Sequence, residues 1–130
     1  MKNFMIIFMV GLSFYGFSQQ NPSTENYSDG TVKTIVQPTG KNTSLVKKFD
    51  ENGNLLETGN WKDGYKDKSW ISYCPDGNIA TIGNFDNGVR EGTWLIFDEK
   101  GKVKYEITYE NNRVVNAFDW EATMAAVKDK

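Results

Sequence analysis

Apolar and aromatic residues recur along the chain in short alternating runs, and most runs end at a turn signal that contains glycine. The clearest example is the run at residues 70–73, which is followed by Pro75-Asp76-Gly77 and by a second run at residues 79–85. Runs rich in β-branched and aromatic residues between such signals are typical of antiparallel strands joined in chain order. The pattern therefore predicts an all-β meander.

This strand, turn and strand design is repeated along the sequence. Phe49, Tyr73 and Phe97 are evenly spaced, since 73 − 49 = 24 and 97 − 73 = 24. The same spacing aligns Gly53 with Gly77 and Gly101, Leu55 with Ile79 and Val103, Trp61 with Phe85 and Tyr109, Gly64 with Gly88, and Trp70 with Trp94 and Phe118. A fixed period of this length is typical of repeat arrays. We predict hairpin repeats over residues 49–118, preceded by a degenerate first unit at residues 27–48.

Two kinds of connection alternate between the predicted strands. The tight kind is typified by Pro75-Asp76-Gly77, in which proline suits a type I turn and glycine the left-handed position of a bulged loop. The longer kind covers residues 63–68 and 87–92, with a glycine able to bend the backbone. Structural turn roles are accordingly assigned to Gly53, Gly64, Gly77, Gly88 and Gly101.

The bulged loop also predicts which strand positions lie opposite each other. Counting outward pairs Cys74 with Asn78, Tyr73 with Ile79 and Ile71 with Thr81. One face of the sheet then carries Phe49, Leu55, Ile71, Tyr73, Ile79, Phe97, Val103, Tyr105, Ile107 and Tyr109. The other carries Lys48, Thr58, Ser72, Lys104, Glu106 and Thr108 together with Trp70, Trp94, Leu56, Ile82 and Ile96.

The two ends of the chain have patterns of their own. Lys2, the apolar stretch at residues 4–14 and the small residues around Ser18 follow the order of a secretory signal peptide, residues 1–18. The mature protein is expected to be exported, either to the periplasm or outside the cell. Residues 19–26 are interpreted as a disordered lead-in, and residues 119–130 as a short helical cap over the last unit.

Composition excludes several classes of chemistry. The 15 basic and 17 acidic residues give a net charge of −2, which offers no basic surface for nucleic acid and does not support binding to anionic lipid. No histidine is present, and Cys74 is the single cysteine, so no cofactor or metal site is predicted. An enzyme is not predicted either, because only scattered carboxylates such as Asp50, Glu57 and Asp98 could serve a hydrolase.

The repeated aromatic residues are the best candidates for a binding surface. A single-layer sheet cannot bury both of its faces, so some apolar side chains remain available to a partner. The candidate residues are Trp61, Trp70, Ile82, Phe85 and Trp94. The competing interpretation is that Trp70 and Trp94 only pack against neighbouring glycines, which is the commoner role of aromatic residues on strands.

The units resemble the MORN repeat, in the variant that is common in a bacterial YwqK-like family of toxin–antitoxin antitoxins. The resemblance is carried by Asn52-Gly53, Gly59-Asn60-Trp61, Asp63-Gly64 and Trp70, and again by Asp76-Gly77, Gly83-Asn84-Phe85, Asn87-Gly88 and Gly92-Thr93-Trp94. The pattern changes where Lys68, Ile107 and Asn112 replace glycines. The resemblance implies a β-hairpin ribbon that contacts proteins or lipids, and an antitoxin-like role, which in an exported protein would be immunity.

Three functions follow from these observations, in decreasing order of support. The first is an exported, non-catalytic interaction module that binds a protein partner on its aromatic surface or along a sheet edge, where it could also self-associate. The second is a carbohydrate or cell-envelope binding protein that uses the repeated aromatic rings as stacking platforms. A hydrolase is a distant third.

Overall fold

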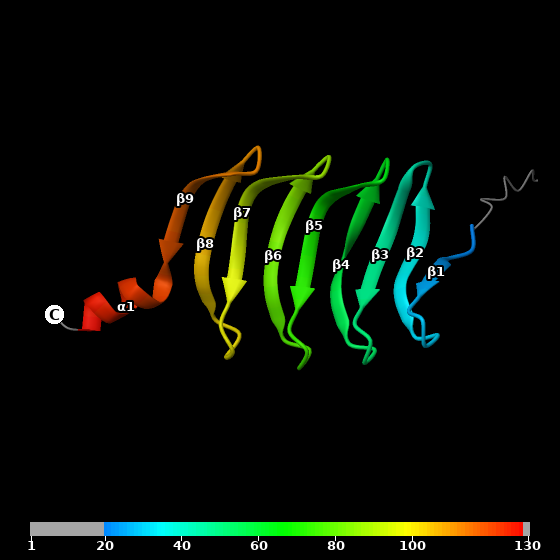
Figure 1. The fold of residues 1–130 in the computed structure, drawn as a ribbon. Helices are drawn as coiled ribbons and strands as arrows, with labels where there is room; N and C mark the ends of the chain where they lie inside the picture. The colour runs from blue at the N-terminus through cyan, green and yellow to red at the C-terminus, as the bar shows by residue number, and fades with distance from the viewer. Residues whose placement is uncertain (1–19, 129–130) are drawn as a thin grey trace, which may run out of the picture.

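The computed structural model describes residues 20–128, and these form one antiparallel sheet with a short helix at its end (Figure 1). Every strand pairs with the strands that precede and follow it in the sequence. The elements are β1 (Ser23–Asn26), β2 (Val32–Gly40), β3 (Thr43–Phe49), β4 (Leu55–Lys62), β5 (Tyr65–Tyr73), β6 (Ile79–Asp86), β7 (Val89–Phe97), β8 (Val103–Glu110), β9 (Arg113–Asp119) and α1 (Trp120–Lys128). The predicted all-β meander of hairpin repeats with one C-terminal helix is confirmed. The predicted signal peptide lies outside the described residues.

Four turns at the lower edge of the sheet in Figure 1 share one geometry. In the central one, the Gly77 N–H donates to the Cys74 carbonyl at 2.9 Å, and the Cys74 N–H donates to the Asn78 carbonyl at 2.8 Å. These bonds define a type I turn closed by a glycine bulge. Gly30, Gly53, Gly77 and Gly101 hold the left-handed position, with φ between +76° and +89°.

An aspartate fastens each of these lower turns. Asp50 and Asp98 accept backbone N–H groups two and four residues later. Cys74 occupies the equivalent position in the central turn, where Asp76 takes over and accepts the Asn78 N–H at 2.9 Å. The central turn therefore needs no aspartate at position 74, because the Asp76 carboxylate accepts the backbone N–H instead.

The predicted register holds only for the pairs next to the turn. Tyr73 pairs with Ile79 as expected, but a bulge then shifts the ladder, so that Ile71 pairs with Ile82 and not with Thr81. The bulge has a steric reason: a regular ladder would place Trp70 opposite Ile82, whereas the shifted ladder places it opposite Gly83. The same shift follows Phe49 and Phe97.

The bulges change which residues share a face, because directly paired residues of antiparallel strands point to the same side. Phe49, Leu55, Ile71, Tyr73, Ile79, Phe97 and Val103 do share one face, and Ile82 and Leu95 join them; we call it the aliphatic face. The opposite, tryptophan face carries Val46, Trp61, Trp70, Phe85, Trp94, Ile96, Tyr105, Ile107 and Tyr109. The prediction was therefore wrong for Tyr105, Ile107, Tyr109 and Ile82. It was also wrong for Thr58, Glu106 and Thr108, which lie on the aliphatic face.

The connections at the upper edge are shorter than the predicted loops. Three of them are two-residue turns with both central residues at positive φ, for example Asp63 at +51° and Gly64 at +82°. Such turns match the twist of the flanking strands. The remaining residues of the expected loops belong to β5 and β7, where Lys68 (φ +59°) and Gly92 (φ +70°) occupy equivalent bulges.

The last repeat departs from the alignment that placed Phe118 with the tryptophans. The bulge between β8 and β9 contains one residue fewer than those before Trp70 and Trp94, so Ile107 pairs with Ala117 and Phe118 pairs with Glu106. Phe118 consequently points to the aliphatic face. An isoleucine in place of the repeat glycine leaves no room for a large ring, and alanine fits there instead.

The ends of the sheet are left open. Residues Ser23–Asn26, expected to belong to a disordered lead-in, form β1 and pair with β2. At the other end α1 extends away from β9 and covers neither face, and none of its residues is buried (Figure 1). The predicted helix is present, but it does not cap the final unit.

Candidate functional site

The tryptophan face is organised by one row of residues that crosses the middle of the sheet. From β3 to β8 the row runs Val46, Gly59, Trp70, Gly83, Trp94 and Ile107. A glycine thus lies beside each tryptophan, and the indole rests on the backbone of the preceding strand. The arrangement gives a sheet of one layer a core, since Val46 (0%) and Trp70 (3%) are the buried apolar residues of the described chain.

Trp70 and Trp94 are held in the same way. The Trp70 Nε1–H donates to the Asn60 carbonyl at 3.0 Å, and the Trp94 Nε1–H donates to the Asn84 carbonyl at 3.2 Å. A Cβ built on Gly59 or Gly83 would clash with the indole that covers that glycine. Both indoles are therefore held against the backbone of the preceding strand.

Aromatic rings continue this arrangement along the face. Phe85 packs edge to face between the two tryptophans, with centroid distances of 6.4 Å to Trp70 and 5.1 Å to Trp94. Tyr109 lies edge to face on the far side of Trp94 at 5.7 Å. The result is a rigid ladder of four rings from three successive repeats.

The side chain of Lys66 covers the outer face of the Trp70 ring. Its ammonium lies 4.1 Å from the Trp70 ring centroid and 5.2 Å from that of Phe85, and it forms a 2.7 Å ion pair with Glu57. Burial, the largest single influence, would raise the pKa of Glu57, but the hydrogen bonds and charges of Lys66 and Lys48 together outweigh it and hold the pKa below its ordinary value. The ionised carboxylate thereby keeps Lys66 above Trp70.

Arg90 occupies the position equivalent to Lys66 but leaves its tryptophan uncovered. Its guanidinium lies 4.8 Å from the Tyr109 ring centroid, and its Nη1 is 3.4 Å from the Tyr109 hydroxyl. Asn112 in the last turn explains the difference, because its Oδ1 accepts the Arg90 backbone N–H at 2.8 Å and lies 3.5 Å from Nε. The Trp94 side chain therefore remains half-buried, whereas the Trp70 side chain is buried.

Beside the exposed part of Trp94 the tryptophan face is hollowed into a groove of about 290 Å³. We call it the aromatic groove; its lining includes Glu57, Lys66, Trp70, Ser72, Thr81, Phe85, Arg90 and Trp94. The Ser72 and Thr81 hydroxyls are hydrogen-bonded to each other at 2.6 Å. The groove combines rigid rings, paired hydroxyls and two cations, which suits a ligand with flat or apolar parts and negative charge.

The five candidate binding residues named from the sequence do not all lie at one site in the structure. Trp70, Phe85 and Trp94 meet at the aromatic groove. Trp61 is on the same face but lines a neighbouring hollow of about 360 Å³ with Tyr27, Lys33 and Leu56. Ile82 points to the aliphatic face, opposite the groove.

Sequence reasoning missed the two cations of the groove. Lys66 and Arg90 lie directly across the ladder from Trp61 and Phe85, respectively. The sequence does contain a signal for this pair, because Lys66 and Arg90 are one repeat period apart: 90 − 66 = 24. A basic residue paired with an aromatic residue in successive units marks a repeated surface feature.

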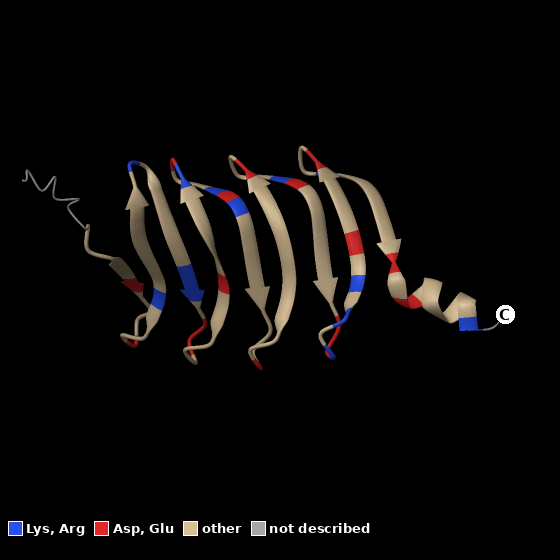
Figure 2. Cartoon of the chain, turned by 180° about the vertical axis from the view of Figure 1, so that it is seen from behind, with Lys and Arg blue, Asp and Glu red and all other residues tan. Residues whose placement is uncertain are grey.

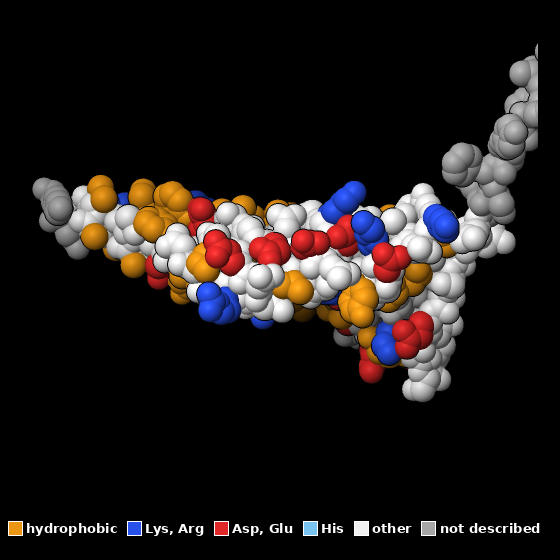
Figure 3. All heavy atoms as spheres, turned by 90° about the horizontal axis from the view of Figure 1, so that it is seen from above, with side chains coloured by type: hydrophobic (Ala, Val, Ile, Leu, Met, Phe, Trp, Pro, Cys, Tyr) orange, Lys and Arg blue, Asp and Glu red, His pale blue; other side chains and the backbone are white. Residues whose placement is uncertain are grey.

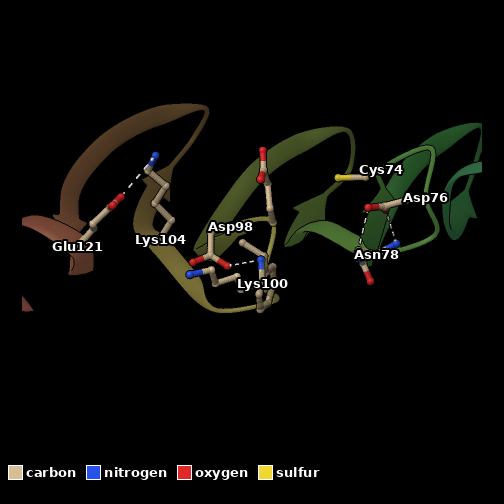
Figure 4. Close-up of a pocket in the computed structure, with 9 residues that line it drawn as sticks. Cys74, Asp76, Asn78, Asp98, Lys100, Lys104 and Glu121 are labelled. Atoms are coloured by element: carbon tan, nitrogen blue, oxygen red, sulfur yellow. Dashed lines mark hydrogen bonds and ion pairs between the residues drawn. The ribbon is translucent and has the colours of Figure 1, made fainter.

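A further hollow, of about 470 Å³, lies between two lower turns and the start of α1 (Figure 4). Its acidic residues serve the local structure: Asp76 and Asp98 fasten their turns, and Glu121 lies 3.6 Å from Lys104. Hydrogen bonds hold the pKa of Asp98 below its ordinary value, chiefly the one from the Lys102 backbone.

The other carboxylates considered for hydrolysis are also engaged in structure. Asp50 binds the side chain and backbone of Asn54, which lowers its pKa, the side-chain hydrogen bond most strongly. Glu57 is ion-paired to Lys48 and Lys66. Within residues 20–128 no group of three or more Cys, Asp or Glu residues could hold a metal ion, and no helix there is long and apolar enough to cross a membrane.

Comparisons with known proteins agree with the repeat architecture. Residues 43–63 and 90–111 match the family model described as the MORN repeat variant. No curated protein matches the chain in a sequence comparison. The crystal structure of TarM is similar in fold, with a TM-score of 0.50 and 13% identity over 78% of this chain and 21% of that one.

A mutant of S. aureus TarM, in complex with fondaparinux, alpha-GlcNAc-glycerol and UDP, gives a TM-score of 0.35 and 12% identity over 78% of this chain and 20% of that one. The chain spans about a fifth of these solved structures. At such identity the likeness to TarM concerns the fold alone. The two matched segments include Trp61, Arg90, Trp94 and Tyr109 of the tryptophan face, and at these two places the sheet is similar to repeats of the MORN variant type.

Proposed function

We propose that this protein is an exported, non-catalytic interaction module that binds a protein partner in the aromatic groove. The observation that carries the proposal is the contrast between two equivalent tryptophans. Lys66 covers Trp70, whereas Arg90 is drawn to Tyr109 and Asn112 and leaves part of Trp94 open. A partly exposed aromatic ring that packs on the backbone is the kind of residue that anchors protein interfaces.

The charges of the groove indicate the chemistry of the partner. Lys48 and Lys66 share the single carboxylate of Glu57, and Arg90 forms no ion pair within the described residues. The face beside Trp94 is thus locally basic, although charges of both signs are interspersed over the sheet as a whole (Figure 2). An acidic segment that also carries an apolar or aromatic side chain would fit both features.

The proposal is tested by capturing partners from an extract of the source cells with immobilised protein. We expect Arg90→Glu to lose the protein captured by the wild type, because the substitution places a negative charge beside Trp94. Lys62→Glu is the matched control: it makes the same change of charge on the aliphatic face, where Lys62 pairs with Tyr65. Equal capture by the two variants, measured by quantitative mass spectrometry, would refute the groove as the binding site.

Export and an immunity or antitoxin-like role are finer parts of the proposal. Export is supported by Lys2 and by the apolar stretch at residues 4–14, and we expect the mature chain to begin near Gln19. An exported protein that still carries residues 1–18, by mass spectrometry, would refute this. A toxin-like reading frame beside the gene would support immunity, and a toxin captured through the aromatic groove would identify the partner.

Binding of a carbohydrate is the second candidate function, and the open face of Trp94 beside the Ser72 and Thr81 hydroxyls favours it. Indole faces and hydroxyls are suited to sugar rings. Sedimentation with insoluble cell-wall polysaccharide distinguishes the candidates. Co-sedimentation that depends on Trp94 would favour the carbohydrate, and its absence would leave the protein partner as the proposal.

A further inference from the structure

Exposed apolar side chains are concentrated at the C-terminal end of the molecule, away from the aromatic groove. Ten large hydrophobic residues of the described chain are exposed, and six of them lie in β9 and α1. They are Val114 (55%), Val115 (46%), Phe118 (37%), Trp120 (41%), Met124 (54%) and Val127 (65%). Seen from above, hydrophobic side chains gather at this end of a molecule that is one sheet thick (Figure 3). A concentration of this kind marks an interaction surface.

The same end presents an open strand edge. β9 pairs with β8 on one side, and no strand of residues 20–128 pairs with its other side. Its seven residues carry charge only at Arg113 and Asp119, the first and the last. Outward-facing backbone N–H and C=O groups on such an edge can pair with another strand.

The opposite edge of the sheet does not offer a matching surface. β1 has only four residues, Ser23–Asn26, all of them hydrophilic and exposed. Its Glu25 is ion-paired to Lys33 at 2.8 Å. A short polar strand is a usual protection against edge-to-edge contact, so a filament in which β9 meets β1 of the next molecule is disfavoured.

The helix adds an apolar stripe beside the open edge. Trp120, Met124 and Val127 follow helical spacing on one side of α1, and the Trp120 ring packs on Phe118 at a centroid distance of 4.7 Å. Asp119 fixes the start of α1 by accepting the Ala122 N–H at 2.9 Å. A nine-residue helix is marginal by itself in water, so a partner that covers this stripe would stabilise it.

We infer that the open edge is covered by a second copy of this chain, with β9 antiparallel to β9 of the partner about a two-fold axis. Charge distribution supports this occupant and this direction. Arg113 begins β9, whereas Asp119 and Glu121 lie at its other end. Antiparallel pairing brings Arg113 beside the acidic end of the partner's strand, where the partner's Glu121 lies. The dimer leaves both aromatic grooves free, so the inference does not depend on the proposed function.

Sedimentation equilibrium of the purified protein over a range of concentrations tests the inference. We expect a dimer that Val115→Lys weakens by at least about tenfold, the change that accompanies loss of an interface anchor. Tyr65→Lys is the matched control, because Tyr65 is a large apolar side chain that is also exposed (56%, against 46% for Val115) and lies at an upper turn remote from β9. Far-UV circular dichroism of each variant verifies that the sheet is retained.

A charge exchange tests the antiparallel direction. Arg113→Glu and Glu121→Lys should each weaken the dimer, and the double variant should restore it, because the two new charges again attract across the two-fold axis. A wild-type protein that stays monomeric at every concentration would overturn the dimer. Equal association of Val115→Lys and wild type would exclude β9, and a double variant no better than the single ones would exclude the antiparallel pairing.

Discussion

At the scale of single residues, the two repeated tryptophans show how equivalent positions acquire different roles. Both indoles cover a glycine and donate to a backbone carbonyl in the same manner. What differs is the position of the equivalent cation: Lys66 is ion-paired to Glu57 and lies over Trp70, whereas Arg90 is hydrogen-bonded to Asn112 and lies over Tyr109. The repeat provides two sites, and neighbouring side chains determine which one remains accessible.

This difference predicts unequal effects of truncation on stability. Trp70→Ala should lower the free energy of unfolding by roughly 3 to 5 kcal/mol, the range for loss of a buried large aromatic residue. Trp94→Ala should cost about half as much, because part of its ring already faces solvent and contributes less on burial. Urea denaturation of the two variants measures both costs. A larger loss for Trp94→Ala would show that the exposed ring is core and that Trp70 is not.

At the scale of elements, the hairpin is a compromise between turn chemistry and the size of neighbouring side chains. The lower turns set the first pair of each hairpin, and in the central hairpin the following bulge then lets Gly83, and not Ile82, face Trp70. Bulges at the other side of each tryptophan, at Lys68 and Gly92, need positive φ. Regular strand pairing is thus interrupted on both sides of each tryptophan, so that the indole can lie flat on the neighbouring glycine.

A prediction at this scale concerns Gly77. A Cβ at this position would meet no atom within 4 Å, so any cost of substitution arises from its φ of +89° and not from crowding. We expect Gly77→Val to destabilise the protein by about 1 kcal/mol or more, as is usual for strained backbone. Asn78→Ser, the neighbouring control, removes only an exposed hydrogen bond to Asp76. Equal shifts of the two melting curves would contradict the turn assignment.

At the scale of the whole molecule, a one-layer sheet has little interior, and each unit is supported mainly by its neighbours. Val46 and Trp70, its buried apolar residues, lie on β3 and β5, near the middle of the array, whereas β1 is exposed throughout. Stability in such arrays is the sum of contributions from the units and from the contacts between them. The ends should therefore open more readily than the centre.

Hydrogen exchange can measure this gradient. Amides of β1 should exchange with little protection, because the strand is short and has a single neighbour, while amides of β5 beside Trp70 should exchange only on global unfolding. Exchange monitored by mass spectrometry on peptides from the two strands supplies the comparison. Similar protection in β1 and β5 would mean that the whole sheet opens as one unit.

The sequence by itself determined the repeat, the meander and the lower turns. These features depend on local chemistry: the 24-residue spacing, the turn residues and the glycines with their permitted φ are all visible along the chain. The same information identified Trp70, Phe85 and Trp94 as members of a common surface.

Only the tertiary structure decided the faces of the sheet and the composition of the groove. A bulge of a single residue reverses every side chain beyond it, which moved Ile82, Tyr105, Ile107 and Phe118 to the face opposite the expected one. Bulges respond to the size of the residue across the ladder, and the ladder is not known until the strands pair. The accessibility of Trp94 likewise depends on Arg90 and Asn112, which are 22 residues apart in the sequence and meet only because β7 and the last turn lie side by side.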